Sequence, residues 1–371
     1  MQPAFEVAQV LNTLGDEVDG FNLNTWKLRT LRAVQHCRTA ALGGHIDACD
    51  DCGHLQISYN SCRNRHCPKC QGHKREEWIA SRTEELLPVP YFHVVFTLPQ
   101  ELNSVTMQHP RAAYDALFDA AWSTLHSFCN NLGVKAGMIA VLHTWGQNLS
   151  LHPHLHCIVP GGGIKLSDHN WKNIRADGKF LFPVKAMAKV FRARYVKALA
   201  EKITIPKNIR QQVFSKNWVV YAKKPFGSSA AVVEYLGRYT HKVAISNHRI
   251  KNITRNAVTF SAKDYRNKGM LKNITLTNTE FIRRFALHIL PKRFVKIRHY
   301  GFLSSSWKRS KLKDLQQRMK VIPLPIKIET KLRKCPCCLN GNLITLEMFS
   351  QRGPPHKNKS SASQTSTPCI Q

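Results

Sequence analysis

Residues 151–160 read LHPHLHCIVP, and this stretch decides how the rest of the chain is interpreted. In an extended strand, side chains two residues apart point to the same face, so His154 and His156 present two imidazoles side by side. Leu155 and Cys157 then face the opposite way. Two neutral imidazoles at this spacing can hold a divalent metal ion. The competing interpretation is a pair of histidines that only form hydrogen bonds at a strand end.

Segments with strand patterns alternate with segments with helix patterns around this stretch. Strand-like runs occupy residues 92–98, 138–145, 154–159 and 218–222. Helical runs occupy about 110–129, 185–202 and 229–239. Strands separated by helices predict a sheet domain of α/β or α+β class across about 90–250. Farther along, 258–261 and 274–277 are strand-like, and 279–289 and a basic run at 305–319 are helical.

Both ends of the chain differ from this domain. Residues 4–42 carry helical periodicity, with Asn24 and Thr25 as candidates for an N-cap. Residues 74–87 have a helical pattern as well. Residues 351–371 are rich in Pro, Ser and Lys, which predicts a disordered tail.

Charge indicates the kind of partner. The 371 residues contain 55 Lys and Arg against 23 Asp and Glu, a formal net charge of +32. An excess spread over the chain, with aromatic residues among the basic ones, favours nucleic acid as the partner. A membrane surface is the weaker alternative, because no basic amphipathic helix stands out. No run approaches the ~18 apolar residues that span a bilayer. The N-terminus lacks the basic start and apolar run of a signal peptide, so we expect a cytoplasmic protein.

Twelve cysteines cluster in short C-x2-C pairs, which favours zinc over disulfides in an intracellular chain. Each tight turn of this kind presents two sulfurs to one metal, so two pairs make a closed tetrahedral site. The four cysteines that we predict to form one such zinc site are Cys49, Cys52, Cys67 and Cys70. The candidates for a second zinc site are Cys37, His45, Cys62 and His66.

Basic residues surround these cysteines. We expect Arg63, Arg65 and Lys69 to contact a phosphate backbone, which would make the cysteine-rich region a DNA-binding module. A solvated face of a scaffold is the alternative for any one of them.

A further cysteine pair lies near the C-terminus. Cys335 and Cys338 form only one C-x2-C unit. We interpret it as a partial site, because a complete zinc site would need further ligands. His356, Cys369 or another chain would have to supply them.

Two tyrosines stand four residues apart in 234–241, which read EYLGRYTH. On a helix, residues four apart lie one turn above each other, so Tyr235 and Tyr239 would project their hydroxyls together. Alone, this pattern is more typical of core packing. Together with a histidine strand on a basic chain, it indicates a pair of nucleophiles.

With these motifs assembled, the sequence resembles the HUH insertion-sequence transposases of the two-tyrosine, rolling-circle class. The resemblance covers roughly residues 30–305, through HCRTAALGGHIDACDDCGH, YNSCRNRHCPKCQ, VPYFHVVFTLP, LHTWGQNLSLHPHLHCIVPGGG, EYLGRYTHKVAISNHRI and RHYGF. It implies an α+β fold, in which a small N-terminal zinc-binding module precedes an HUH nuclease domain with a central antiparallel sheet flanked by helices. The expected parts are a helical segment (1–36), a zinc-binding DNA-binding domain (37–87), the nuclease domain (88–305), a basic extension with the partial Cys motif (306–350) and the tail (351–371).

The resemblance also assigns metal ligands. In this family the histidine strand binds a divalent ion, usually Mg²⁺ or Mn²⁺, so His154 and His156 would be ligands here. The third ligand is commonly a polar residue from a neighbouring element. We choose Gln147, with His143 and His152 as alternatives.

The implied function is DNA transposition. A tyrosine, Tyr235 or Tyr239, would attack single-stranded DNA at the end of a mobile element and leave a 5′-phosphotyrosine. The other basic residues that we expect to contact DNA are Arg238, Lys242, Arg283 and Arg284. A plasmid relaxase or replication initiator with the same chemistry is one alternative, and a zinc-dependent DNA-binding regulator is another. A transposase of this class would act on the bacterial nucleoid, and the sequence leaves its oligomeric state open.

Overall fold

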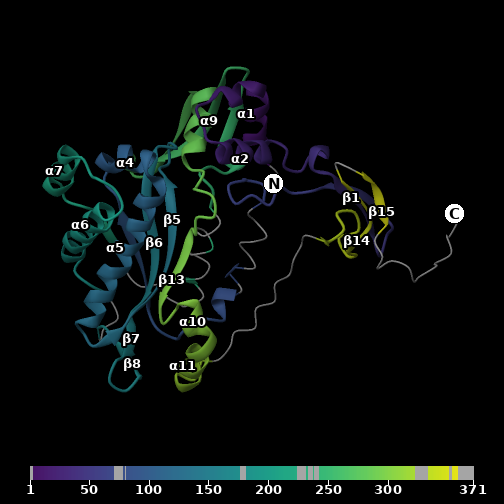
Figure 1. Ribbon diagram of the computed structural model, residues 1–371. Helices are drawn as coiled ribbons and strands as arrows, with labels where there is room; N and C mark the ends of the chain where they lie inside the picture. The colour runs from purple at the N-terminus through teal and green to yellow at the C-terminus, as the bar shows by residue number, and fades with distance from the viewer. Residues whose placement is uncertain are drawn as a thin grey trace.

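A computed structural model shows a mixed architecture of helices and antiparallel sheets (Figure 1). It describes residues 3–70, 78–79, 81–175, 181–223, 231–232, 237, 242–321, 333–350 and 353–357. The helices are α1 (Val7–Leu14), η1 (Gly15–Gly20), α2 (Thr25–Gln35), η2 (Ala40–Leu42), η3 (Gln100–Leu102), α4 (Asn103–Gln108), α5 (Pro110–Asn130), α6 (Val184–Ala200), α7 (Lys207–Ser215), η4 (Asn247–Arg249), η5 (Tyr265–Asn267), α9 (Asn278–Leu287), α10 (Ser305–Trp307), η6 (Lys308–Leu312) and α11 (Lys313–Arg318). The predicted α+β class is confirmed.

The strands belong to separate sheets. They are β1 (Gly44–Cys49), β2 (Leu55–Tyr59), β3 (Tyr91–Thr97), β4 (Val134–Lys135), β5 (Gly137–Trp145), β6 (Leu151–Pro160), β7 (Gly162–Lys165), β8 (Trp171–Asn173), β9 (Val220–Lys223), β10 (Ile250–Ile253), β11 (Ala257–Asp264), β12 (Met270–Thr277), β13 (Ile297–Gly301), β14 (Leu343–Ser350) and β15 (Gly353–Lys357). The largest sheet has the order β13-β5-β6-β3-β9, and all its neighbouring strands run antiparallel. This sheet is the predicted central antiparallel sheet.

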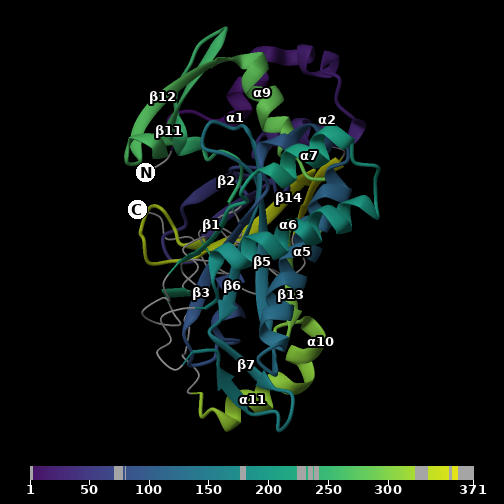
Figure 2. The same cartoon turned by 90° about the vertical axis from the view of Figure 1, so that its left-hand side faces the viewer.

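The two faces of the central sheet differ, as alternation in an extended strand requires. Phe96, Leu155 and Cys157 are fully buried on one face and belong to one core with α5 and α6. The ring centroids of Phe96 and Phe191, from β3 and α6, lie 4.9 Å apart. Figure 2 shows these helices crossing in front of the sheet. The opposite face carries the histidines of β5 and β6.

Helix α5 covers this sheet because its apolar residues recur at helical spacing. It begins with Pro110 in the first turn, where a missing N–H costs no hydrogen bond. Tyr114, Leu117, Ala121 and Leu125 follow on one buried face. The predicted helices at 110–129 and 185–202 are therefore confirmed as α5 and α6, and 279–289 as α9.

A second core joins the N-terminal helices to the elements between Ala244 and Ile289. Leu11 of α1 and Leu31 of α2 pack with Phe260 of β11 and Phe281 of α9 in one buried cluster. The side chain of Asn24 accepts a hydrogen bond from the Lys27 N–H at 3.0 Å, so the expected N-cap of α2 is confirmed. The N-terminal helices thus pack on the β10-β11-β12 sheet and α9, at the top of Figure 1.

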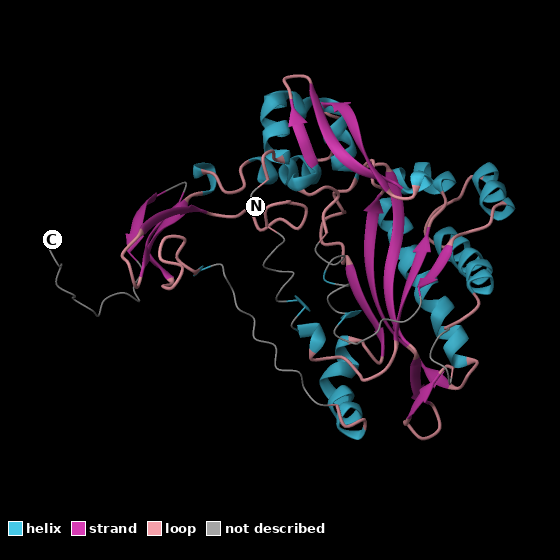
Figure 3. Cartoon of the chain, turned by 180° about the vertical axis from the view of Figure 1, so that it is seen from behind, coloured by secondary structure: helices cyan, strands magenta, loops and turns pink. Residues whose placement is uncertain are grey.

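A small four-stranded sheet lies apart from this body (Figure 3) and has the order β15-β14-β1-β2. In it Gly44 of β1 stands opposite Tyr59 of β2 and Phe349 of β14. The segment that we expected to be a C-terminal extension therefore pairs with the zinc-binding module. Residues 353–357, expected to be part of a disordered tail, form β15.

Other differences concern the ends of elements. The predicted strand at 218–222 begins at Val220, and Trp218 instead packs in the core, where its indole N–H donates to the Val213 carbonyl at 2.8 Å. The basic run at 305–319 is helical as expected, with a π-helical turn in η6. Of the predicted helix at 74–87, residues 78–79 and 81–83 are helical, and residues 74–77 and 80 lie outside the described residues. Most of the predicted helix at 229–239 lies outside the described residues.

Gly301 provides a test of this packing. Its φ is +61°, and a Cβ at this position would lie 1.8 Å from the Ala136 carbonyl oxygen. Gly301→Ala should therefore destabilise the protein by more than about 2 kcal/mol. Alanine is strained in the left-handed conformation, and its Cβ would also clash with the backbone of Ala136. The measurement is the denaturation midpoint in guanidinium. Gly20→Ala is the control, since no atom lies within 4 Å of a Cβ there. Equal midpoints for both variants would contradict the placement of β13 against β5.

Candidate functional site

Three histidines meet on the open face of the central sheet. His143 of β5 stands directly opposite His154 of β6, and His156 follows two residues later on the same strand. Their ligand nitrogens all lie within 4.8 Å of one another. His143 and His156 are buried, and His154 is partly buried. The structure therefore places the predicted histidine pair together and adds a third imidazole to it.

One hydrogen bond defines the tautomer of His154. Its Nδ1 lies 2.6 Å from the carbonyl oxygen of His152. A carbonyl only accepts, so Nδ1 must carry the proton and Nε2 keeps a lone pair. Histidines that bind metals commonly donate their second ring N–H to a carbonyl in this way.

A fourth histidine forms a hydrogen bond with the cluster. His93 of β3 places its Nε2 at 2.8 Å from Nδ1 of His156, and the side chain is 4% exposed. The two rings stack with a centroid separation of 5.1 Å. Sequence reasoning missed His93, although alternation along 92–98 puts it on the same face as the other histidines.

Burial keeps these imidazoles neutral. Desolvation lowers the pKa of His154 and of His93 to about 4. It also lowers the pKa of His156, where the charge of a protonated His154 adds to the effect. Because a metal binds the neutral imidazole, the ligand form predominates at neutral pH.

A partly buried lysine lies near the cluster. Lys296 lies over the Trp145 ring at 5.3 Å from its centroid, and Trp145 in turn stacks on His143. Lys296 donates a hydrogen bond of 2.8 Å to the Lys242 carbonyl. Desolvation of its ammonium group lowers the pKa of Lys296 to about 7. An anionic substrate beside this group would favour its charged form.

For the third ligand, the structure favours another side chain than Gln147, which stays a prediction. Gln147 lies in the turn between β5 and β6, past the end of the paired strands, and its carbonyl accepts a hydrogen bond from Arg249. His152 is exposed. His143 is the side chain that strand pairing brings to the pair, because it lies across from His154 in the adjacent strand. The sequence offered His143 only as an alternative, because spacing along the chain does not show which residue lies across from His154.

Both predicted nucleophiles, Tyr235 and Tyr239, lie outside the described residues, as does Arg238. The described residues on either side of them lie near the histidine face. Val232 is buried in a cluster with Tyr91 and with Ile158, which lies two residues beyond His156 on β6.

The cysteines form two clusters, and neither is the one that we predicted. Cys67 and Cys70 lie with Cys37 and Cys62, whereas Cys49 and Cys52 lie with Cys335 and Cys338. In the first cluster, Cys70 Sγ is 3.3 Å from Cys37 Sγ and 3.6 Å from Cys62 Sγ. The single site predicted from Cys49, Cys52, Cys67 and Cys70 is thus divided. Cys49 and Cys52 lie where β1 turns into β2, whereas Cys67 and Cys70 follow β2.

The two histidines of the predicted second zinc site have other partners. His66 Nε2 accepts a hydrogen bond from the Leu290 N–H at 3.3 Å, and burial lowers its pKa to about 3. His45 Nε2 lies 3.2 Å from a carboxylate oxygen of Asp47. Only Cys37 and Cys62 of that prediction join a cysteine cluster.

Several residues expected to contact DNA are engaged within the protein. Arg65 donates to the carbonyls of Pro291 and Phe294, and Lys69 pairs with Glu6 at 2.5 Å. The Arg65 contacts attach the first cysteine cluster to the segment between α9 and β13, and the Lys69 contact attaches it to the N-terminal segment. Arg284 binds Glu280 at 2.7 Å. The side chains that remain exposed are Arg63, Lys242 and Arg283.

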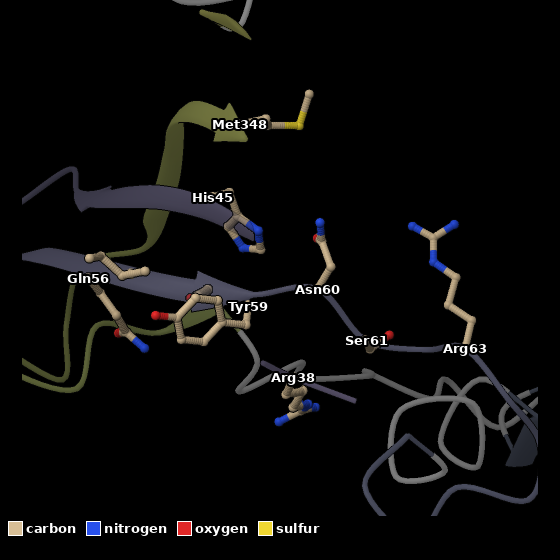
Figure 4. Close-up of a pocket in the computed structure, with 10 residues that line it drawn as sticks. Arg38, His45, Gln56, Tyr59, Asn60, Ser61, Arg63 and Met348 are labelled. Carbon is tan, nitrogen blue, oxygen red and sulfur yellow. The ribbon is translucent and has the colours of Figure 1, made fainter. Parts of the chain in front are cut away.

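A hollow of about 860 Å³ opens on the zinc-binding module (Figure 4). Arg38 and Arg63 line it together with the half-exposed Tyr59, from the end of β2. Among the ten described residues that line it, none is acidic. The hollow therefore combines positive charge with an aromatic face.

Comparison with known proteins identifies the family. Residues 137–311 match a family described as "Putative transposase", and residues 10–98 match one described as "Transposase zinc-binding domain". "Putative transposase y4qJ" of Sinorhizobium fredii (strain NBRC 101917 / NGR234) is 40% identical, over 94% of this chain and 97% of its own. "Transposase for insertion sequence element IS801" of Pseudomonas savastanoi pv. phaseolicola is 28% identical, over 75% of this chain and 70% of its own. No solved structure matches the chain significantly.

The fold, the cysteine clusters and these similarities define a transposase with an N-terminal zinc-binding domain. The chain belongs to the IS91 family of transposases, enzymes that cleave and transfer DNA. Within the described residues, no helix is both long enough and apolar enough to cross a membrane.

The third metal ligand can be tested directly. His143→Ala should weaken Mn²⁺ binding more than about tenfold, because it removes a buried imidazole from the cluster. Gln147→Ala should leave the affinity unchanged. Isothermal titration of Mn²⁺ into the zinc-loaded protein measures both. A loss of affinity in the Gln147 variant, with none in the His143 variant, would restore the original choice of ligand.

Proposed function

We propose that the protein nicks and rejoins single-stranded DNA at the ends of a mobile element by rolling-circle transposition. The observation that carries this function is the set of three adjacent imidazoles on the open face of the central sheet. A plasmid relaxase or replication initiator would use the same chemistry, but the family similarity favours transposition.

In this proposal His143, His154 and His156 hold the catalytic divalent ion. The donor set fits a metal, since burial keeps the imidazoles neutral and the His154 tautomer leaves Nε2 as a ligand. The ion would be Mg²⁺ or Mn²⁺, as the resemblance to HUH transposases implies. When bound, such an ion polarises the scissile phosphate and stabilises charge on its oxygens.

His93 positions this cluster. Its ring nitrogen can accept the Nδ1 proton of His156, which would leave Nε2 of His156 to face the metal. Both rings are buried and have lowered pKa values, so a neutral pair with one shared hydrogen bond is the favoured state.

Tyr235 or Tyr239 would attack the phosphorus of the scissile phosphate. The phenol loses its proton, its oxygen bonds to phosphorus and the P–O3′ bond breaks. The products are a 5′-phosphotyrosine and a 3′ oxygen that takes up a proton. The bond energy is retained, so a free 3′-OH can later attack the phosphotyrosine and rejoin the strand.

The neighbours of the tyrosine segment support this assignment. Val232, three residues before Tyr235, is buried against Ile158 of the histidine strand. At the other end, the Lys242 carbonyl binds Lys296, which lies over the Trp145 ring beside His143. The segment between Val232 and Lys242 therefore starts and ends near the proposed metal centre. The basic residues nearby would also favour the phenolate form.

The zinc-binding module would bind the DNA. Cys37, Cys62, Cys67 and Cys70 are the proposed ligands of a structural zinc ion, which shapes the loop that carries Arg63. The hollow beside this loop offers Tyr59 as a stacking surface for a base and Arg38 and Arg63 as partners for phosphates.

Covalent trapping tests the nucleophiles. With Mn²⁺ and a labelled single strand that carries an end of the element, the native protein should form a covalent adduct. Tyr235→Phe combined with Tyr239→Phe should abolish the adduct, because both candidate hydroxyls are gone. Tyr221→Phe, at an exposed tyrosine of β9, is the control and should keep it. An adduct that persists in the double variant would show that another residue attacks. DNA binding with no adduct in the native protein would favour a non-enzymatic regulator.

A binding assay tests the hollow. Arg38→Ala with Arg63→Ala should weaken binding to a single strand by about tenfold and lower the salt dependence by about 0.7 per lost phosphate contact. Lys189→Ala, at an exposed position of α6, should change neither. Fluorescence anisotropy at several salt concentrations gives both quantities. An unchanged salt slope in the double variant would place the DNA elsewhere.

A further inference from the structure

We propose that Cys49, Cys52, Cys335 and Cys338 bind a second structural zinc ion, whose ligands come from opposite ends of the chain. Neither family match reaches the second pair, since the matches cover residues 10–98 and 137–311. This second site depends on the geometry of the cysteines and not on the tyrosine chemistry proposed above.

The sulfur positions fit a tetrahedral thiolate site. Cys49 Sγ lies 3.6 Å from Cys338 Sγ, and Cys52 Sγ lies 3.7 Å from Cys335 Sγ. Zn–S bonds of about 2.3 Å in a tetrahedron place the sulfurs about 3.8 Å apart. A disulfide would require about 2.05 Å. The sulfurs are therefore spaced to share a metal and not to bond with each other.

Backbone amides point at sulfurs on the N-terminal and C-terminal turns alike. Cys49 Sγ accepts from the N–H groups of Asp51 and Cys52 at 3.4 and 3.5 Å. On the other turn, Cys335 Sγ accepts from the Cys337 N–H at 3.4 Å and Cys338 Sγ from the Gly341 N–H at 3.2 Å. Hydrogen bonds of this kind fix the orientation of the sulfurs, as outer-shell partners do in metal sites.

The two turns also bind each other directly. The Asp50 N–H donates to the Asn342 carbonyl at 3.0 Å, and the Asn342 N–H donates to the Asp50 carboxylate at 2.6 Å. The amide of Asn340 donates to the Asp51 carboxylate at 3.3 Å. Strand β14 begins at Leu343 and pairs with β1 from there on. The C-terminal pair is thus docked on its partner and is not a partial site.

Gly341 allows the turns to come this close. A Cβ on Gly341 would lie 2.4 Å from Cys49 Sγ and 2.6 Å from the Cβ of Asp51. Both distances are below any ordinary contact, so a side chain here would push the sulfur away. Residues 335–341 read CPCCLNG. Cys335 and Cys338 in this stretch supply two ligands, and Gly341 leaves space for the sulfur of Cys49.

The consequence is a metal cross-link between the zinc-binding module and the C-terminal strands. Residues 333–350 contact the zinc-binding module in two ways. Strand β14 pairs with β1, and the turn that carries Cys335 and Cys338 binds the turn that carries Cys49 and Cys52. A bound zinc would hold β14 beside β1, and β1 leads through β2 to the hollow lined by Arg38 and Arg63.

Zinc stoichiometry tests the second site. Full-length protein, purified under reducing conditions, is weighed by native mass spectrometry and its zinc is measured by elemental analysis. We expect two zinc ions per chain. Cys335→Ser with Cys338→Ser should leave one, and so should Cys49→Ser with Cys52→Ser. All four substitutions together should also leave one, because both pairs serve the same ion.

Cys337→Ser is the matched control. Cys337 is exposed, lies in the same turn and belongs to neither cysteine cluster, so this variant should keep two zinc ions. One zinc in the native protein would overturn the second site, as would iron in place of zinc or a mass deficit that reveals disulfides. Two zinc ions in the Cys49 and Cys52 double variant would show that the C-terminal pair finds its ligands elsewhere. The native protein alone decides the stoichiometry, even where a variant fails to fold.

Discussion

The structure depends on the alternation of side chains along β6. Leu155 and Cys157 are fully buried against the helices, while His154 and His156 face the other way. A slip of one residue in register would exchange the two sets, burying imidazoles under α5 and exposing leucine. Packing of the apolar face therefore holds the histidines in position, and β5 and β3 on either side add His143 and His93 to the same surface.

Burial gives this surface its chemistry. Desolvation lowers the pKa values of the histidines, so they remain neutral and can act as ligands without a nearby carboxylate. Net positive charge of +32 on the chain then supplies the attraction for DNA that the neutral cluster lacks. In the proposed function, the neutral histidines bind the metal and the net positive charge of the chain attracts the DNA.

The cysteines organise a separate part of the molecule. The cluster of Cys37, Cys62, Cys67 and Cys70 packs beside the N-terminal helices, and Arg65 attaches its loop to the carbonyls of Pro291 and Phe294. The other cluster joins the zinc-binding module to the C-terminal strands. Both arrangements link segments that are far apart in the chain, which a small sheet with few apolar residues needs for stability.

The sequence by itself determined the local features. Alternation placed His154 and His156 on one face, helical periodicity predicted α5, α6 and α9, and the C-x2-C spacing marked the cysteine turns. Only the tertiary structure decided which distant groups meet. His143 reaches His154 through strand pairing, and Cys49 finds Cys338 across most of the chain. Local spacing reports which way a side chain points, whereas the identity of its partner depends on register and topology, which arise from the packing of the whole chain.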